Sequence, residues 1–261
     1  MNIIILFSVL FSLNSANASQ GFNDLSGLIV GGQVVLPDDP IAKSTVGVFA
    51  NGAFCTGSII DVDLVVTAAH CLSGPVSGVK IVYGGEIFSS SPHPESPAAS
   101  YEVNSLYKGP QWEVDWGDIA LIRIQGKLLN NSVPAEILSV KRPLVATDQA
   151  VLAGYGINDV PNYSGSGTLR KATVAIVVPQ IGKTEVAVDS SHGSGACHGD
   201  SGGPAFLPAE QGGHGIQLWG VTSHAYPNSA PDDCAEGAVY TNIVSYLDWI
   251  QQAATRLRQQ N

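Results

Sequence analysis

Basic residues are scarce in this sequence. It holds 12 Lys and Arg against 22 Asp and Glu, so its formal net charge at pH 7 is −10. Nucleic acid and anionic membrane surfaces attract positive charge, so both are poor partners for this chain. Beyond the first eighteen residues, no apolar stretch is long enough to cross a bilayer. We therefore expect neither a nucleic-acid partner nor a membrane anchor.

Cysteine is also rare. The four cysteines, Cys55, Cys71, Cys197 and Cys234, show no C-x-x-C spacing, which makes a zinc site a weak interpretation. An H-E-x-x-H motif is missing as well, which argues against a metal-dependent hydrolase. We expect no metal and no cofactor. Sequence alone allows three disulfide pairings, and free thiols are the alternative.

The first eighteen residues predict a secretory signal peptide. An apolar run from Ile3 to Leu13 is followed by Ala16-Asn17-Ala18, a small-x-small cleavage site, although Lys and Arg are missing from the region before the run. We expect export to an extracellular or periplasmic compartment, with cleavage after Ala18. Cysteines in such a compartment are expected to form disulfides.

Long helical patterns are few, and short β-rich runs recur instead. With 29 glycines and 15 prolines punctuating these runs, the chain predicts an antiparallel sandwich or barrel. Residues 84–100 and 158–167 are interpreted as surface loops, and a domain boundary is placed between residues 125 and 150. Apolar residues at helical spacing from Ile243 to Leu257 predict a C-terminal amphipathic helix. The runs are Ile29–Val35, Thr45–Phe49, Cys55–Ile60, Leu64–Thr67, Val79–Tyr83, Ile119–Ile124, Ala150–Ala153, Leu169–Val178, Ile216–Ser223 and Ala238–Thr241.

One serine stands in a segment suited to chemistry. Ser201 lies in GACHGDSGGP, where it is either a nucleophile or part of a glycine-rich turn. A serine hydroxyl attacks only when a base removes its proton, and that base is usually a histidine oriented by a carboxylate. His70 is the next-to-last residue of the apolar segment VVTAAHC, and Asp118 opens the apolar segment DIALIRI. Taken alone, His70 is better interpreted as a partly buried structural histidine, and the common alternative for Asp118 is an aspartate in the turn at a strand start.

The segment GDSGG also fits G-x-S-x-G, the motif of α/β-hydrolases. That motif needs a strand before the serine and a helix after it. The flanking segments SSHGSGACH and GGPAFLP favour neither. The hydrolase interpretation is therefore rejected.

Taken together, the motifs resemble the trypsin/chymotrypsin family of serine proteases. VVTAAHC, DIALIRI and GDSGGP occur in the order His, Asp, Ser, and the resemblance covers residues 29–252. Further segments similar to the family are Ile29–Gly32, Phe54–Ile60, Gly154–Gly156 (with Tyr155 in place of Trp), Gly220–Ser223 and Val239–Thr241. The resemblance implies an all-β fold of two packed six-stranded antiparallel β-barrels with a C-terminal helix, and a site in the cleft between them.

The resemblance also implies roles for particular residues. The catalytic residues are His70, Asp118 and Ser201, and the backbone N–H groups of Gly199 and Ser201 form the oxyanion hole. Its disulfides are Cys55–Cys71 and Cys197–Cys234. Residues 19–28 are an activation peptide whose removal frees the amino group of Ile29 to pair with Asp200, so that residues 29–261 form the protease domain.

The resemblance further assigns the substrate-binding residues. Gly195 stands at the expected base of the pocket, where an Asp would bind Arg or Lys, and Ala225 and Ala238 stand at its walls. Ser223, His198 and His224 are also placed at the substrate, with His224 where the family usually has Trp. This small, uncharged pocket predicts an apolar residue before the scissile bond. Because Leu28 precedes Ile29, the chain is expected to be able to activate itself.

The sequence thus predicts a secreted serine endopeptidase made as a zymogen. Its partners are protein or peptide substrates, and protein inhibitors are possible partners. The alternative is a catalytically inactive binding protein on the same scaffold. Such proteins usually lack a catalytic residue or the oxyanion glycine, and none of these is missing here.

Overall fold

Strands dominate the computed structural model, which describes residues 29–111, 114–129, 131–208, 215–226 and 234–260. The predicted signal peptide (1–18) and activation peptide (19–28), including Leu28, lie outside these residues. No helix in the described ranges is both long and apolar enough to cross a membrane.

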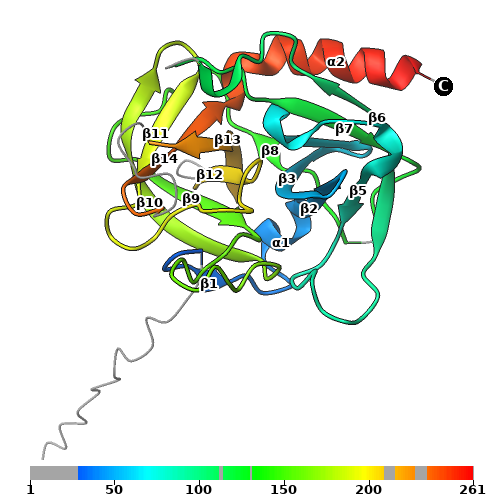
Figure 1. The fold of residues 1–261 in the computed structure, drawn as a ribbon. Coiled ribbons are helices and arrows are strands. Elements are labelled where there is room, and N and C mark those ends of the chain that lie inside the picture. Colours follow the sequence, from blue (N-terminus) through cyan, green and yellow to red (C-terminus); the bar gives the residue numbers. More distant parts are fainter. Residues whose placement is uncertain (1–28, 112–113, 130, 209–214, 227–233, 261) are drawn as a thin grey trace, which may run out of the picture.

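Six antiparallel strands of the first half close into a barrel (Figure 1). Their order around the barrel is β2-β3-β4-β7-β6-β5. Alternate side chains point inward and bury an aliphatic core that includes Val48, Ile59 and Leu121. The strands are β2 (Thr45–Ala50), β3 (Ala53–Asp61), β4 (Leu64–Thr67), β5 (Val79–Val82), β6 (Glu95–Val103) and β7 (Ala120–Ile124).

The second half forms another closed barrel. β9 and β10 pair with each other as well as with their other neighbours, which closes the ring β9-β10-β11-β14-β13-β12. Trp219 and Tyr240 lie in its core. Its strands are β9 (Gln149–Gly154), β10 (Arg170–Ile181), β11 (Glu185–Asp189), β12 (Pro204–Pro208), β13 (Ile216–Ala225) and β14 (Gly237–Asn242). The prediction of two six-stranded antiparallel barrels is confirmed.

Short elements connect and cover the barrels. β8 (Glu136–Ile137) adds a parallel pair to β13, within the connection between the barrels. The 3₁₀ turns are η1 (Ala69–Cys71), η2 (Val76–Gly78), η3 (Gly109–Gln111) and η4 (Ile243–Tyr246). The predicted C-terminal helix is present as α2 (Leu247–Gln259), which begins later than expected because Ile243–Tyr246 forms η4.

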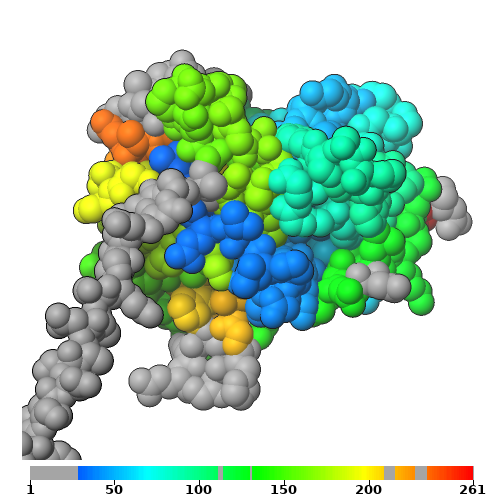
Figure 2. All heavy atoms as spheres, turned by 90° about the horizontal axis from the view of Figure 1, so that it is seen from below, coloured from blue at the N-terminus to red at the C-terminus, as the bar shows by residue number. Residues whose placement is uncertain are grey.

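Each end of the described chain packs on the barrel formed by the other half. Near the start, β1 (Gln33–Val34) pairs with β10 of the second barrel, and α1 (Pro40–Ser44) then contacts β2 and β3 of the first. Figure 2 shows this segment in dark blue across the base of the molecule. At the other end, α2 packs on β6 and β7 of the first barrel. There Arg256 donates from Nη2 and Nε to the two carboxylate oxygens of Glu102, at 2.6 and 3.0 Å.

The surface-loop prediction for residues 84–100 is wrong over its second part, where β6 begins at Glu95. Pro97 suggested a loop because proline has no N–H to give to a sheet. It is tolerated here because a β-bulge lies between Ala98 and Ser100, immediately after it. The inward residues Ser96, Ala98 and Ser100 are small and buried, so the strand shows little apolar alternation. The short strands β11 and β12 were also not predicted.

Candidate active site

His70 and Asp118 meet because β4 and β7 are paired. Thr67 at the end of β4 lies opposite Ala120 at the start of β7, so η1 and the residue before β7 are neighbours. His70 Nδ1 lies 2.7 Å from Asp118 Oδ2, and the His70 backbone N–H donates to Asp118 Oδ1 at 2.9 Å. Asp118 is fully buried, whereas the His70 side chain is 29% exposed. A buried carboxylate thus fixes both the ring and the backbone of an accessible imidazole.

The second barrel also contacts Asp118. The Ser223 hydroxyl on β13 donates to Asp118 Oδ2 at 2.6 Å. The Thr241 hydroxyl on β14 donates to the Asp118 backbone carbonyl at 3.0 Å. These bonds satisfy a carboxylate that burial alone would penalise. Asp118 therefore lies at the junction of the two barrels.

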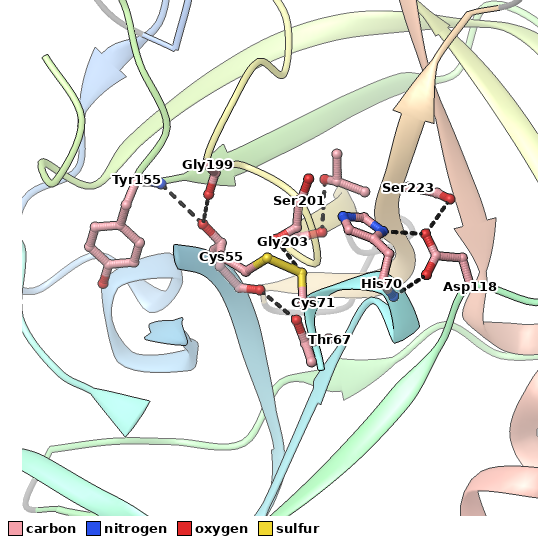
Figure 3. The surroundings of a disulfide bond; sticks show 12 residues. Cys55, Thr67, His70, Cys71, Asp118, Tyr155, Gly199, Ser201, Gly203 and Ser223 are labelled. Carbon is pink, nitrogen blue, oxygen red and sulfur yellow. Dashed lines mark hydrogen bonds and ion pairs between the residues drawn. A yellow bond between two sulfur atoms is a disulfide. The ribbon is translucent and has the colours of Figure 1, made fainter. Parts of the chain in front are cut away.

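Ser201 is supplied by the loop before β12. Its backbone carbonyl accepts a hydrogen bond from the Thr56 N–H at 2.8 Å, which ties the loop to β3 of the first barrel. Gly202 N–H donates to the Thr222 carbonyl at 2.8 Å, which ties the same loop to β13. In Figure 3, the Ser201 side chain lies beside the ring of His70, with Asp118 on the other side of that ring. The structure thus brings the three sequence-predicted residues together.

Gly199 shapes the backbone before Ser201. Its φ is +97°, a left-handed conformation that side chains disfavour, and a Cβ at this position would lie 2.9 Å from Gly156 Cα. The Thr56 hydroxyl donates to the Gly199 carbonyl at 2.9 Å. The same hydroxyl oxygen accepts from the Tyr155 N–H at 3.3 Å. The carbonyl of Gly199 is therefore held on Thr56, within a loop where glycine is required.

Asp200 is buried behind this loop. Its carboxylate accepts hydrogen bonds from the N–H groups of Gly156 at 2.8 Å and Cys197 at 2.9 Å. Burial raises the pKa of Asp200 to about 6, against the opposing effects of these bonds and of the Arg170 charge. Ile29 is also buried, in the core of the second barrel, and the next residue, Val30, accepts from the Gly195 N–H at 3.0 Å.

A cavity of about 170 Å³ opens beside Ser201. The lining contains no Asp, Glu, Lys or Arg among the described residues. Ala225 and Ala238, which are paired between β13 and β14, lie on its wall as the sequence predicted. Gly195 is not among the lining residues, because it pairs with Val30 and packs against the Ser190 side chain. The lining residues are Ala196, Cys197, His198, Ser201, Thr222, Ser223, His224, Ala225, Cys234, Gly237 and Ala238.

Two histidines border this cavity. The ring of His198 lies 5.1 Å from that of Tyr163. The ring of His224 stacks on Trp116, with centroids 3.8 Å apart and planes 9° from parallel. Burial lowers the pKa of His224 to about 4, although the nearby Asp118 charge opposes this effect. His224 is therefore neutral at neutral pH and gives the cavity no positive charge.

Both implied disulfides are present. Cys55–Cys71 joins β3 to the turn that carries His70, and Cys197–Cys234 joins the Ser201 loop to the segment before β14 (Figure 3 shows the first). His70 and His198 each lie within 4.8 Å of one of these cysteine pairs. Because the sulfurs are bonded to each other, they offer no thiolate ligands to a metal ion.

Sequence reasoning missed several residues that support the site. Thr56 holds the Gly199 carbonyl, Trp116 stacks on His224, and Glu185 accepts from the Asp115 and Trp116 N–H groups at 2.8 and 2.7 Å. Trp116 stands only two positions before Asp118, and this proximity in the sequence could have identified Trp116 as a residue of the site. Glu185 begins a run of alternating valines, and this pattern gives no sign that its carboxylate contacts the Asp118 loop.

The fold and the site define a class of protein, the serine proteases built on two six-stranded barrels. The sequence profile of the trypsin family, described as Trypsin, matches residues 29–250. The chain therefore belongs to the trypsin family of serine endopeptidases.

Individual relatives agree with this assignment. Chymotrypsin-2 of Vespa crabro is 32% identical over 214 residues, which cover 76% of this chain and 88% of that protein. Snake venom serine protease 5 of Trimeresurus stejnegeri is 27% identical over 238 residues, 87% of each chain. Among solved structures, mouse neuropsin, described as a serine protease expressed in the limbic system of the brain, has a TM-score of 0.69 at 25% identity. The match covers 85% of this chain and 98% of neuropsin.

Proposed function

We propose that this protein is a secreted endopeptidase that cleaves peptide bonds through an acyl-enzyme, with Ser201 as nucleophile. The observation that carries the proposal is the 2.7 Å contact between His70 Nδ1 and the buried Asp118 carboxylate, with Ser201 beside the same ring. That contact places a proton on Nδ1 and leaves Nε2 of His70 to act as the base. Asp118 orients the imidazole and stabilises its protonated form.

In the proposed reaction, Ser201 Oγ bonds to the substrate carbonyl carbon while its proton passes to His70. The backbone N–H groups of Gly199 and Ser201 donate to the oxyanion that forms, a contribution worth about 3–4 kcal/mol of barrier per donor in comparable sites. The C–N bond then breaks as His70 returns the proton to the leaving amine. Water attacks the acyl group by the same steps and releases the carboxylic acid.

The cavity beside Ser201 supports an apolar residue before the scissile bond. It is small, its wall carries Ala225 and Ala238, its described lining has no Asp, Glu, Lys or Arg, and burial keeps His224 neutral at neutral pH. A positively charged side chain would enter it without a counter-ion, at a cost in desolvation. We expect a peptide library that varies this position to be cleaved best after Leu, Met or aromatic residues.

The proposed triad is tested by Ser201→Ala. This variant should lose casein hydrolysis and labelling by an organofluorophosphate, and it should keep the melting temperature of the wild type, because Ser201 is only partly buried. Undiminished cleavage by the variant would exclude Ser201 as the nucleophile. A folded wild-type protein that begins at Ile29 and neither cleaves nor reacts with the label would instead be the inactive binding protein.

The zymogen proposal places residues 19–28 as an activation peptide. Removal would free the amino group of Ile29, whose side chain is already buried in the second barrel, to pair with Asp200. The apolar preference proposed for the pocket makes the bond after Leu28 a substrate for the enzyme itself. N-terminal sequencing of purified Ser201→Ala protein tests this, since the appearance of Ile29 as the first residue without added protease would contradict self-activation.

A further inference from the structure

The two barrels are joined beside Asp118 by a pair of stacked rings. Trp116 comes from the loop before β7 of the first barrel, and His224 comes from β13 of the second. Their centroids are 3.8 Å apart and their planes are 9° from parallel, which is full face-to-face contact. His224 Nδ1 also lies 3.0 Å from Ser223 Oγ, the atom that donates to Asp118.

The directions of these hydrogen bonds follow from proton counting. Ser223 has one hydroxyl proton, which its 2.6 Å contact assigns to Asp118 Oδ2, because an ionised carboxylate can only accept. The Ser223 oxygen must then accept from His224, so the His224 proton lies on Nδ1. Asp118 Oδ2 accepts from His70 on its other side. A continuous chain runs from His224 through Ser223 and Asp118 to His70.

Trp116 is itself held in place by the second barrel. Its backbone N–H donates to Glu185 Oε1 at 2.7 Å, while the Asp115 N–H donates to Oε2 of the same buried carboxylate at 2.8 Å. In return, the Asp115 carboxylate accepts from the N–H groups of Lys183 and Thr184 at 2.7 and 2.9 Å. The loop that carries Trp116 is thus clamped to the β10–β11 hairpin. A fixed indole restricts the rotation of the imidazole stacked on it.

We propose that His224 is a positioning residue for the reaction, acting through Ser223 on the Asp118–His70 pair, with Trp116 fixing its ring plane. This inference rests on the proposed function. An imidazole at residue 224 supplies an N–H that a hydrocarbon ring in the same stack would lack. His224 therefore donates to Ser223, which in turn donates to the Asp118 carboxylate.

The expected effect on His70 has a definite sign. A hydroxyl that accepts a hydrogen bond becomes a stronger donor, so His224 strengthens the Ser223–Asp118 bond. This bond withdraws negative charge from Asp118 on the side that faces His70. The charged groups that act on the His224 ring are Asp118 and His70 themselves. Losing the His224 donor should leave more charge on Asp118, favour protonated His70 and raise the pKa of His70.

Two variants at residue 224 separate the N–H donor from the ring. His224→Phe keeps an aromatic ring against Trp116 and loses the donor, whereas His224→Asn loses the ring and keeps an amide N–H close to the Nδ1 position. The pKa of His70 is measured by NMR titration of histidine-labelled protein in the Ser201→Ala background, where no turnover is needed. His224→Phe should raise this pKa by about 0.5 unit, and His224→Asn should leave it within about 0.2 unit.

The same shift should appear in activity. With Ser201 present, the acid limb of kcat/KM for a peptide substrate should move to higher pH in His224→Phe and stay in place in His224→Asn. An unchanged His70 pKa in His224→Phe, or equal shifts in both variants, would refute the proposal and leave His224 a packing residue. The proposed function can fail separately, since it requires that Ser201→Ala abolish cleavage whatever happens to the His70 pKa.

A measurement without any substitution at residue 224 completes the test. The ring-nitrogen shifts of His224, in the labelled protein at pH 7, report which nitrogen carries the proton. A neutral ring protonated on Nδ1 is expected. Protonation on Nε2 would leave Nδ1 unable to donate to Ser223. That result would overturn the proposal even if His224→Phe failed to fold.

Discussion

At the scale of single residues, Asp118 has the most demanding environment in the site. Each oxygen of its buried carboxylate accepts a bond from His70, and Oδ2 accepts a second bond from Ser223. All of these partners are donors. A side chain at residue 118 that carries its own N–H would therefore place one donor opposite another, and no hydrogen bond could form there. The site therefore demands an acceptor at both oxygens.

Asp118→Asn should for this reason lower kcat about 10⁴-fold, because the amide favours the wrong tautomer of His70. The mismatch should also cost about 1–3 kcal/mol of unfolding free energy. Steady-state kinetics with a peptide substrate and urea unfolding of the same samples measure the two effects. A kcat less than tenfold below wild type would show that Asp118 does not control the imidazole.

Gly199→Ala tests the oxyanion loop. The variant should lower kcat about 10²–10³-fold, because a Cβ would strike Gly156 Cα and turn the Gly199 N–H away from the substrate. Gly126→Ala is the matched control, since Gly126 has a similar φ of +82° and open space around its Cβ position. The control should lose about 1–2 kcal/mol of stability and no activity. Equal loss of kcat in both variants would contradict a specific role for Gly199.

The three central residues could be predicted because VVTAAHC, DIALIRI and GDSGGP, in this order, resemble segments of the trypsin/chymotrypsin family. The sequence could not predict the stack of Trp116 on His224, or the clamp of Glu185 on Asp115. These contacts join residues of different barrels, and no periodicity in either segment depends on the other. The resemblance placed His198 and His224 at the substrate, and both border the cavity; burial and stacking on Trp116 also give His224 an internal position.

At the scale of elements, the turn that carries His70 is fixed at both ends. β4 leads directly into η1, and Cys71 at the end of η1 is bonded to Cys55 on β3. The same strand, β3, holds the Ser201 loop through Thr56. One strand of the first barrel thus sets the position of both the base and the nucleophile.

Replacing Cys55 and Cys71 together by Ala should lower the unfolding free energy by about 3 kcal/mol, as expected for a cross-link that spans 16 residues. The activity of the remaining folded protein should fall as well, because η1 loses its tie to β3. Urea unfolding and active-site titration of the same sample measure the two effects. An unchanged unfolding midpoint would show that the bridge contributes nothing to the barrel.

Elements with ordinary apolar alternation were predictable, and the exceptions have physical causes. β6 contains a proline beside a bulge and buries small polar residues, so it lacks the strand pattern. β12 is only five residues long and begins and ends with proline, at Pro204 and Pro208, a residue that is disfavoured inside sheets. Barrel closure supplies the partners that keep such segments extended.

At the scale of the whole molecule, the proposed activation couples the chain terminus to the Ser201 loop through Asp200. The raised pKa of this buried carboxyl means that the folded chain holds a proton between pH 4 and 6 that the unfolded chain releases. Without a cationic partner, ionisation of Asp200 costs about 3 kcal/mol of stability at neutral pH, and this cost vanishes below about pH 4.

Processing should therefore stabilise the protein in a pH-dependent way. Ser201→Ala proteins that begin at Ser19 and at Ile29 should differ in melting temperature at pH 7, with the shorter chain more stable, and the difference should shrink towards pH 4.5. Calorimetry at several pH values measures it, and Asp200→Asn in both chains is the control that should remove the pH dependence. A difference that does not vary with pH would argue against the ion pair between Ile29 and Asp200.

The exchange of terminal segments between the barrels has a topological consequence. β1 belongs to the first half of the chain and pairs in the second barrel, whereas α2 belongs to the second half and lies on the first barrel. Each half of the chain therefore contributes a terminal segment that packs on the barrel of the other half. A molecule cleaved in the linker between β7 and β8 should stay associated as a two-chain complex. Either fragment alone would expose to water the surface on which the terminal segment of the other fragment packs.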